Sequence, residues 1–331
     1  MVSFEPHPLL RNRHLMTFAA ALWPRRYPLL LPPTDRLFEV EPGTQVLARC
    51  HWQAEPRRCP TLVLVHGLEG SSESPYMLGI AGKAFRAGCN VLRMNQRNCG
   101  GTERLTPSLY NSGLSGDFRA VLMELLEHDA LPEIFFAGYS MGGNLVLKMA
   151  GDLSAAAPAQ LRAVATVCPG LDLAAGADAL ALPGNSIYEW NFLRDLRKRL
   201  RRKAQLFPDR YRLDGIGRIR TLREWDDVVT APHCGYRDAN DYYARASALR
   251  VAAAIGVPTL ILVAQDDPFI PLGSFRDPAI VQNPNITVVA PQHGGHCAFI
   301  SNADGEERFW AEARVVEFCL RHSKLAGAKE P

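Results

Sequence analysis

The stretch FFAGYSMGGNLVLKMAGD (residues 135–152) leads an apolar, strand-like run directly into a helical pattern, with Ser140 at the bend. Gly138 and Gly142 flank the serine at the two positions where a Cβ would collide in a sharp strand-to-helix corner, and the segment matches G-x-S-x-G. In this context the serine is interpreted as an exposed nucleophile. The alternative interpretation is a turn serine that caps the helix.

Around this corner, short apolar runs closed by turn signals alternate with helical patterns. A hairpin is expected in RLFEVEPGTQVLARCHW (residues 36–52), where two alternating runs surround Pro42 and Gly43. Near-continuous apolar runs indicate strands covered on both faces, so the expected fold class is α/β, with a mostly parallel sheet of about eight strands flanked by helices. The predicted strands are 61–67, 90–95, 133–138, 163–168, 259–264 and 286–291, and the predicted helices are 75–88, 113–129, 141–153 and 306–322.

One interval interrupts this alternation. Residues 171–250 contain helix-like and aromatic segments but no run typical of a buried strand. An insertion between two core strands predicts a helical lid over the carboxyl edge of the sheet. The expected organisation is therefore a core of residues 1–170 and 251–331, in which residues 1–34 form an N-terminal extension packing on the core, and an inserted lid of residues 171–250.

The composition is that of a globular chain and narrows the classes of function. Its 331 residues are 47% hydrophobic and 21% charged, and a net charge of +3 is too small to indicate nucleic acid as a partner. Neither a phosphate loop with its lysine nor a G-x-G-x-x-G after a strand is present, so no cofactor is expected. The start does not resemble a secretory signal, no run approaches the roughly 20 apolar residues that span a bilayer, and eight cysteines without a CxxC pair favour a reducing compartment. A cytoplasmic location is expected.

A serine nucleophile needs an imidazole to take its proton and an acid to orient that imidazole. In sheets of this kind the acid and then the histidine follow the serine, in loops at the carboxyl ends of later strands. LVAQDDPFIP offers Asp267, which directly precedes a proline and begins its loop, and PQHGGHCAF offers His296. With Ser140 they form the expected catalytic triad. Asp266 and His293 remain the alternatives for acid and base.

The oxyanion that develops in such a reaction needs backbone donors that are already in place. The amide of Met141, directly after the nucleophile, is the first candidate. LVLVHGLEGSS places Leu68 just after a buried strand, and its amide is the second candidate. His66 and Gly67 are expected to support this loop, as the two glycines of the corner support the serine. A catalytic role for His66 is the alternative.

Seven segments jointly match one family pattern, although each alone is weak: PLLRNRHLMT, HGLEGSSESPY, RMNQRNCGGTERLTPSLYNSGLSGD, GYSMGGN, DDVVTAPHCGYRDANDYY, DDPFIP and HGGHCAF. Together they resemble the α/β-hydrolase superfamily and, within it, the YheT-like family of predicted esterases, related to mammalian abhydrolase-domain proteins that act on lipids. The resemblance covers most of the chain. It implies an α/β-hydrolase fold with Ser140, Asp267 and His296 in the triad positions, and a short- or medium-chain acyl ester as the substrate class. Residues 97–101 depart from the family's usual arginine-glycine step. This departure affects the expected shape of the pocket and leaves the triad unchanged.

Two further features bear on other functions. RDLRKRLRRK (residues 194–203) carries seven basic residues in ten, which with an interleaved apolar stripe predicts a basic amphipathic helix over residues 193–207. Such a helix could make a peripheral contact with an anionic membrane. The alternative is a solvated lid helix whose stripe packs on the core. His293, His296 and Cys297 have a metal-like spacing, but HxxH in a glycine loop is weak evidence, so no metal is expected.

The sequence therefore predicts a serine esterase that forms an acyl-enzyme and releases the acid with water. An acyltransferase, which passes the acyl group to an alcohol, would use the same triad. A non-catalytic acyl-binding module that keeps the fold and the pocket is the alternative from another class. The predicted partner is a small acyl ester or lipid, because an apolar lid favours acyl chains over polar substrates.

Overall fold

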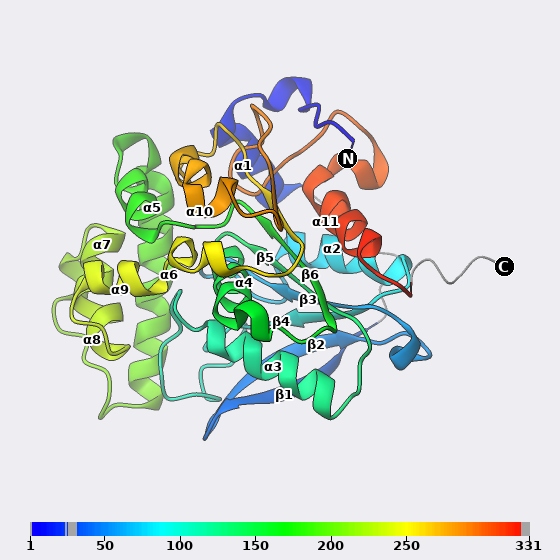
Figure 1. Ribbon diagram of the computed structural model, residues 1–331. Helices are drawn as coiled ribbons and strands as arrows, with labels where there is room; N and C mark the ends of the chain where they lie inside the picture. Colours follow the sequence, from blue (N-terminus) through cyan, green and yellow to red (C-terminus); the bar gives the residue numbers. More distant parts are fainter. Residues whose placement is uncertain (1, 24, 26–31, 326–331) are drawn as a thin grey trace.

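An eight-stranded sheet forms the centre of the molecule (Figure 1). The computed structural model describes residues 2–23, 25 and 32–325. The strands lie in the order β1-β2-β4-β3-β5-β6-β7-β8; β1, β2 and β4 pair antiparallel, and all other neighbours are parallel. The predicted mostly parallel sheet with an N-terminal antiparallel hairpin is confirmed. The strands are β1 Thr34–Glu41, β2 Thr44–His51, β3 Thr61–Val65, β4 Asn90–Met94, β5 Ile134–Tyr139, β6 Leu161–Val167, β7 Thr259–Leu262 and β8 Ile286–Val289.

Helices cover both faces of this sheet. α2 packs with α11 on one face, and α3 packs with α4 on the other (Figure 1). The last helix, predicted from residue 306, begins at Trp310, because Gly305–Arg308 form a short 3-10 turn that starts at a glycine with φ of 63°. The helices of the core are α2 Pro75–Arg86, α3 Ser115–Glu127, α4 Met141–Leu153, α10 Pro278–Val281 and α11 Trp310–Arg321.

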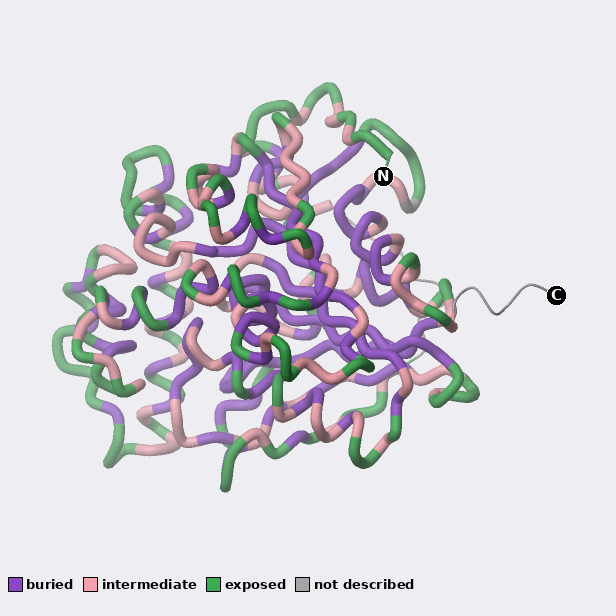
Figure 2. Tube along the Cα trace, viewed as in Figure 1, coloured by how far each residue is buried: buried purple, intermediate pink, exposed green. Residues whose placement is uncertain are grey.

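The middle strands are buried on both faces, as their apolar runs predict. Every residue of β3, β4 and β5 is buried. The prediction for β8 is wrong in this respect: its residues are partly exposed, because β8 is an edge strand with only β7 beside it. Figure 2 shows the buried part of the trace concentrated on the central strands, with exposed segments at the loops and at the outer helices.

The segment 171–250, which the structure describes completely, contains helices and turns but no strand. It gathers beside the core at the left of Figure 1. Asn144 of α4 connects it to the core, since its side chain accepts the amide of Ala248 and donates to the carbonyl of Ala246. That the segment acts as a lid stays a prediction. Its elements are α5 Leu173–Leu180, α6 Ser186–Leu206, α7 Leu222–Trp225, the π-helical turn Asp226–Thr230, α8 Ala231–His233 and α9 Ala239–Ala246.

The N-terminal helix α1, Arg13–Leu22, packs against loops near the end of the chain. Residues 1, 24 and 26–31 of the predicted N-terminal extension lie outside the described residues. Of the helices in the described part of the chain, none combines the length and the apolar character needed to cross a bilayer. The cluster that holds α1 consists of Met16, Ala20, Ala298, Ile300 and Phe309.

Candidate active site

Ser140 occupies a tight corner between β5 and α4. Its φ of 52° and ψ of −118° are strained for a residue with a side chain, and that side chain makes no capping hydrogen bond to the helix. The flanking glycines make the turn possible. A Cβ on Gly138 would lie 2.3 Å from the carbonyl oxygen of Gly142, and a Cβ on Gly142 would lie 2.4 Å from the carbonyl oxygen of His66. The interpretation as a helix-capping serine therefore has no support in the contacts.

His296 lies between Ser140 and Asp267. Its Nε2 is 3.0 Å from Ser140 Oγ, and its Nδ1 is 2.8 Å from Asp267 Oδ2. The Asp267 side chain is fully buried, and its other oxygen accepts the amides of Phe269 and Ile270 at 3.1 and 3.0 Å. With a proton on Nδ1 donated to the carboxylate, Nε2 is free to accept the serine hydroxyl.

Two opposing effects act on the His296 imidazole. Burial lowers its pKa, but the charge of Asp267 and the hydrogen bond to it outweigh burial and raise the pKa above the ordinary value of 6.5. The ring of Phe269 covers the imidazole, with 4.0 Å between the ring centroids. The surroundings thereby stabilise the imidazolium that would form if the serine gave up its proton.

The alternative acid and base pair with each other instead. Asp266 Oδ2 lies 3.3 Å from His293 Nδ1, and Asp266 Oδ1 accepts the amide of Gly295 at 3.0 Å. This pair braces the loop from which His296 extends. Of the two acid–histidine pairs, the one containing His296 is in contact with Ser140.

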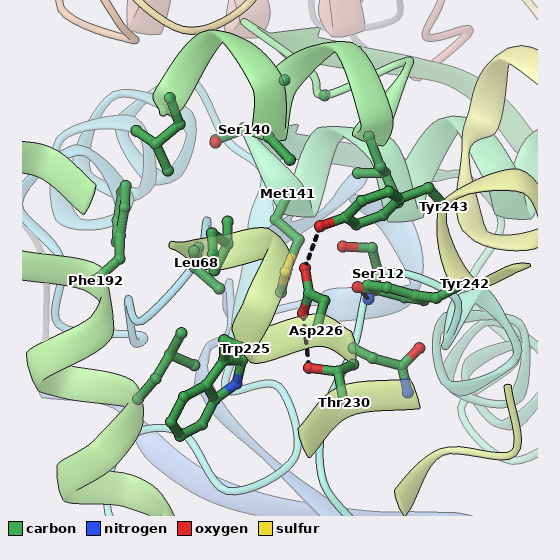
Figure 3. Close-up of a pocket in the computed structure, with 18 of the residues that line it drawn as sticks. Leu68, Ser112, Ser140, Met141, Phe192, Trp225, Asp226, Thr230, Tyr242 and Tyr243 are labelled. Carbon is green, nitrogen blue, oxygen red and sulfur yellow. Dashed lines mark hydrogen bonds between the residues drawn. The ribbon is translucent and has the colours of Figure 1, made fainter. Parts of the chain in front are cut away.

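Two backbone amides beside the serine, those of Leu68 and Met141, have no protein acceptor within the described part of the chain. Both residues line the same pocket as Ser140 (Figure 3). Met141 is the first residue of α4, where helix amides have no intrahelical partner. Free amides in this position are able to bind an oxyanion.

The loop after β3 is held by buried polar contacts. His66 is fully buried; its Nδ1 donates to the carbonyl of Gly67 at 2.7 Å, and its Nε2 accepts the amide of Gln96 at 3.1 Å. Burial lowers the pKa of His66 to about 4, so the ring is neutral. The Tyr76 hydroxyl accepts the amide of Gly67 at 2.9 Å. Because both of its ring nitrogens are occupied, His66 has no free nitrogen for a second catalytic base.

An arginine of the inserted segment reaches the same loop. Arg199 of α6 forms an ion pair with Glu69 at 2.9 Å, and Glu69 also accepts the hydroxyl of Tyr110. The Arg199 and Glu69 side chains are 12% and 7% exposed, so the pair is largely buried. Glu69 directly follows Leu68. The inserted helix is thereby connected to the loop that carries one of the two free amides.

The basic segment 194–203 does not form a uniform charged surface. Arg197 and Lys203 donate to backbone carbonyls, and Arg199 is held by Glu69. The apolar stripe packs inward, with Leu193, Leu196 and Leu200 buried. The inward packing agrees with the solvated-helix alternative for the stripe. The basic residues that remain exposed are Arg194, Lys198, Arg201 and Arg202.

Two thiols lie beside the imidazole. Among the described residues, Cys168, His296 and Cys297 form the one group of three potential metal ligands, with ligand atoms within 4.8 Å of one another. Cys297 Sγ is 3.6 Å from His296 Nε2, the nitrogen that also contacts Ser140. A metal bound there would compete with the serine for that nitrogen.

The N-terminal helix also contacts the histidine loop. The Thr17 hydroxyl of α1 accepts the amide of His296 at 2.9 Å and donates to the carbonyl of Arg13 at 2.7 Å. Sequence reasoning assigned no role to Thr17, and a single threonine in a helical pattern carries no signal of such a contact.

A mostly apolar pocket opens beside Ser140, formed by the core on one side and by α5, α6, α7 and α9 on the other (Figure 3). Leu180, Phe192, Leu196 and Trp225 are among its lining residues. Polar residues interrupt this wall, among them Asp172, Arg199 and Asp226. Asp226 accepts the hydroxyls of Thr230 and Tyr243. Sequence reasoning missed this group, because isolated polar residues in an irregular helical segment form no recognisable pattern.

These features define the α/β-hydrolase fold: the sheet order, the strained serine corner and the acid–histidine pair that follows it. The chain belongs to this family, because the family model described as alpha/beta hydrolase fold matches residues 60–303. One relative is "Putative esterase YheT" of Escherichia coli (strain K12), 32% identical over 322 residues that cover 95% of this chain and 92% of that protein. "Phospholipase ABHD3" of Mus musculus is 32% identical over 244 residues, covering 73% of this chain and 58% of that protein. Among solved structures, 2,6-dihydroxy-pseudo-oxynicotine hydrolase aligns with a TM-score of 0.59 at 17% identity, over 94% of this chain and 73% of that one, which shows a shared fold. The family predicted from the sequence motifs is confirmed.

Proposed function

We propose that this protein is a serine esterase that cleaves carboxylic esters with short- to medium-chain or lipid-like acyl groups. The observation that carries the proposal is the continuous line of contacts from Asp267 through His296 to Ser140, at 2.8 and 3.0 Å. Membership of the α/β-hydrolase fold family supports hydrolytic chemistry. Relatives named as an esterase and a phospholipase support esters as the substrates.

In the proposed first half-reaction, Ser140 Oγ attacks the ester carbonyl carbon while His296 Nε2 takes the hydroxyl proton. Asp267 keeps the other imidazole nitrogen protonated and balances the positive charge. The amides of Leu68 and Met141 donate to the oxyanion of the tetrahedral intermediate. The imidazolium then protonates the leaving alcohol, and the acyl group remains on the serine.

In the second half-reaction, a water molecule takes the place of the departed alcohol. His296 removes its proton as the water oxygen attacks the acyl-serine carbonyl. The same two amides hold the second oxyanion. Collapse of this intermediate breaks the bond to Ser140 Oγ, which recovers its proton from the imidazolium, and the carboxylic acid is released.

The pocket supports the choice of acyl esters. Its wall beside Ser140 is mostly apolar, and the inserted segment 171–250 contributes much of it, which fits the proposed role of that segment as a lid. The exposed basic residues of α6 are the part of that helix available for a peripheral contact with an anionic membrane. The eight cysteines are all free thiols, which suits the proposed cytoplasmic location.

A panel of p-nitrophenyl esters of increasing acyl length tests this function. The wild-type protein is expected to release p-nitrophenol, and Ser140→Ala is expected to lose about 10⁴-fold or more in kcat. Ser186→Ala, a change of an exposed serine at the start of α6, is the matched control and is expected to keep full activity. Hydrolysis that persists in Ser140→Ala would refute the proposal. An added alcohol that yields ester faster than acid appears would instead identify an acyltransferase.

A further inference from the structure

A buried carboxylate lies in the wall of the pocket and takes no part in the proposed triad. Asp226, the first residue of the π-helical turn, is 7% exposed and lines the same pocket as Ser140 (Figure 3). The wall around it includes Leu200 and Trp225. A carboxylate in apolar surroundings carries a desolvation cost unless its charge is paired or its oxygens are fully hydrogen-bonded.

The hydrogen bonds of Asp226 offset only part of this desolvation cost. Thr230 Oγ1 donates to one carboxylate oxygen at 2.7 Å, and the Tyr243 hydroxyl donates to the other at 2.8 Å. An ionised carboxylate has about four acceptor positions, so two donors leave about half of them unused. Within the described residues no cation forms an ion pair with Asp226. The charge of Arg223 lowers the pKa of Asp226, but the Arg223 side chain forms its ion pair with Asp178.

Burial raises the pKa of Asp226 to about 6, while the two hydroxyl donors and the charge of Arg223 act in the opposite direction. Two other charged residues line the pocket, but both are engaged elsewhere: Asp172 caps α5 through the amide of Ala175, and Arg199 pairs with Glu69. The pocket therefore combines the serine at one point of its surface, a mostly apolar wall, and the Asp226 carboxyl group with free acceptor positions.

We propose that Asp226 is a binding subsite for a hydrogen-bond donor, a hydroxyl or ammonium group, carried on the acyl chain of the substrate. This inference rests on the proposed ester hydrolysis at Ser140 and adds a substrate class to it: esters whose acyl chain is apolar along its length and polar near its far end. A plain alkyl chain entering the pocket would exclude water from the carboxylate and give it no partner. A chain with a donor would supply that partner.

The acyl chain, rather than the alcohol, is the part assigned to this subsite. The alcohol leaves after the first half-reaction, whereas the acyl group stays bonded to Ser140 until water releases it. A mostly apolar pocket that is lined by the serine itself suits the part that stays. Thr230 and Tyr243 hold the carboxylate in one orientation, so the donor meets an acceptor that is already in place.

The test compares p-nitrophenyl esters that are matched in acyl length and end in a methyl, a hydroxymethyl or an ammonium group. The measured quantity is the ratio of kcat/KM for the donor-bearing ester to that for the plain ester, on one enzyme preparation, so the folded fraction cancels. In the wild type this ratio is expected to peak at one chain length, because the donor reaches Asp226 at one distance. Asp226→Leu is expected to lower the peak ratio about tenfold or more, as for the loss of a hydrogen bond to a charged group.

Two further sets of variants separate binding from a merely structural role. Tyr243→Phe and Thr230→Val keep the carboxylate and free another acceptor position on it, so they are expected to retain or increase the ratio. If they instead lower it as Asp226→Leu does, Asp226 serves only to join its turn to α9 and the subsite is refuted. Asp226→Asn keeps the shape and removes the charge, and is expected to lower the ratio most for the ammonium esters.

The outcomes also distinguish this inference from the function on which it rests. A wild-type enzyme that hydrolyses the plain esters, with the same ratio as Asp226→Leu at every length, overturns the subsite and leaves the esterase standing. An enzyme that hydrolyses none of the three series overturns the proposed function, and the subsite falls with it.

Discussion

Arg199 of α6 forms a largely buried ion pair with Glu69, the residue that follows Leu68. Arg199 also donates to the carbonyl of Asn98, so it joins two loops of the core at once. The inserted segment is thus fixed to the loop that carries one of the two proposed oxyanion donors. A change in the insertion, remote from Ser140 in sequence, should therefore alter the chemical step.

Arg199→Met is expected to lower kcat about tenfold with a smaller effect on KM. The variant leaves Glu69 buried without its partner and loosens the amide of Leu68, whose full loss would cost about 10²–10³-fold. Arg202→Met is the matched control: it lies on the same helix and pairs with Glu103, but its side chain is 53% exposed. Steady-state kinetics of both variants provide the measurement. An equal, small effect of the two changes would contradict the connection.

The raised pKa of His296 determines the direction of the pH profile. The imidazole must be neutral to accept the serine proton, so kcat/KM is expected to rise with pH and to reach half its maximum above pH 6.5. Asp267→Asn removes the charge that raises the pKa of His296, while burial, which lowers the pKa, continues to act. The midpoint should then move to lower pH while the plateau falls by about 10³–10⁴-fold. Profiles of kcat/KM measured from about pH 5 to about pH 10 test both expectations. A midpoint that does not move after the substitution would refute the assignment of Asp267 as the acid.

A glycine-to-alanine change in the corner around Ser140 and one in the exposed part of α3 are expected to have opposite effects on stability. Gly142→Ala would place a Cβ 2.4 Å from a backbone carbonyl oxygen, so a loss of more than about 4 kcal/mol in the free energy of unfolding, or failure to fold, is expected. Gly116→Ala in α3 meets no atom within 4 Å and should stabilise by about 0.5–1 kcal/mol. Urea unfolding measures both. Similar stabilities of the two variants would show that the corner is not sterically constrained.

Thr17 offers a test of how α1 contributes to the site. Thr17→Val keeps the shape but removes the acceptor for the His296 amide, and should cost about 1–3 kcal/mol in stability together with a fall in kcat/KM. Thr17→Ser restores the hydroxyl and is expected to behave as the wild type. Thermal unfolding and ester hydrolysis check this pair. Loss of activity in Thr17→Ser as great as in Thr17→Val would mean that packing, and not the hydrogen bond, matters there.

The fold and the residues of the proposed triad could be anticipated because they follow from local rules. A glycine on each side of Ser140 is required by backbone collisions, and the carboxyl ends of parallel strands bring the loops of Asp267 and His296 to one edge. The choice between neighbouring residues was less secure from sequence alone. The position of Asp267 before a proline favours it over Asp266, but the three-dimensional path of the loop decides which carboxylate contacts His296.

The features that sequence reasoning missed depend on contacts between distant, irregular segments. Asp226 meets Tyr243 across a π-helical turn, which no periodicity indicates. The inward orientation of Arg199 and Lys203 could not be foreseen, because basic residues occupy almost every face of their helix. The exposure of β8 depends on its place at the edge of the sheet, and an apolar run does not show which strand is last.

The central claim is that Ser140 is a nucleophile activated by His296, and covalent labelling with a fluorophosphonate probe tests it most directly. Peptide mass spectrometry is predicted to find the label on Ser140 in the wild type, no label there in Ser140→Ala, and much slower labelling in His296→Ala. A folded wild-type protein that takes up no probe, or takes it up at another residue, would contradict the account.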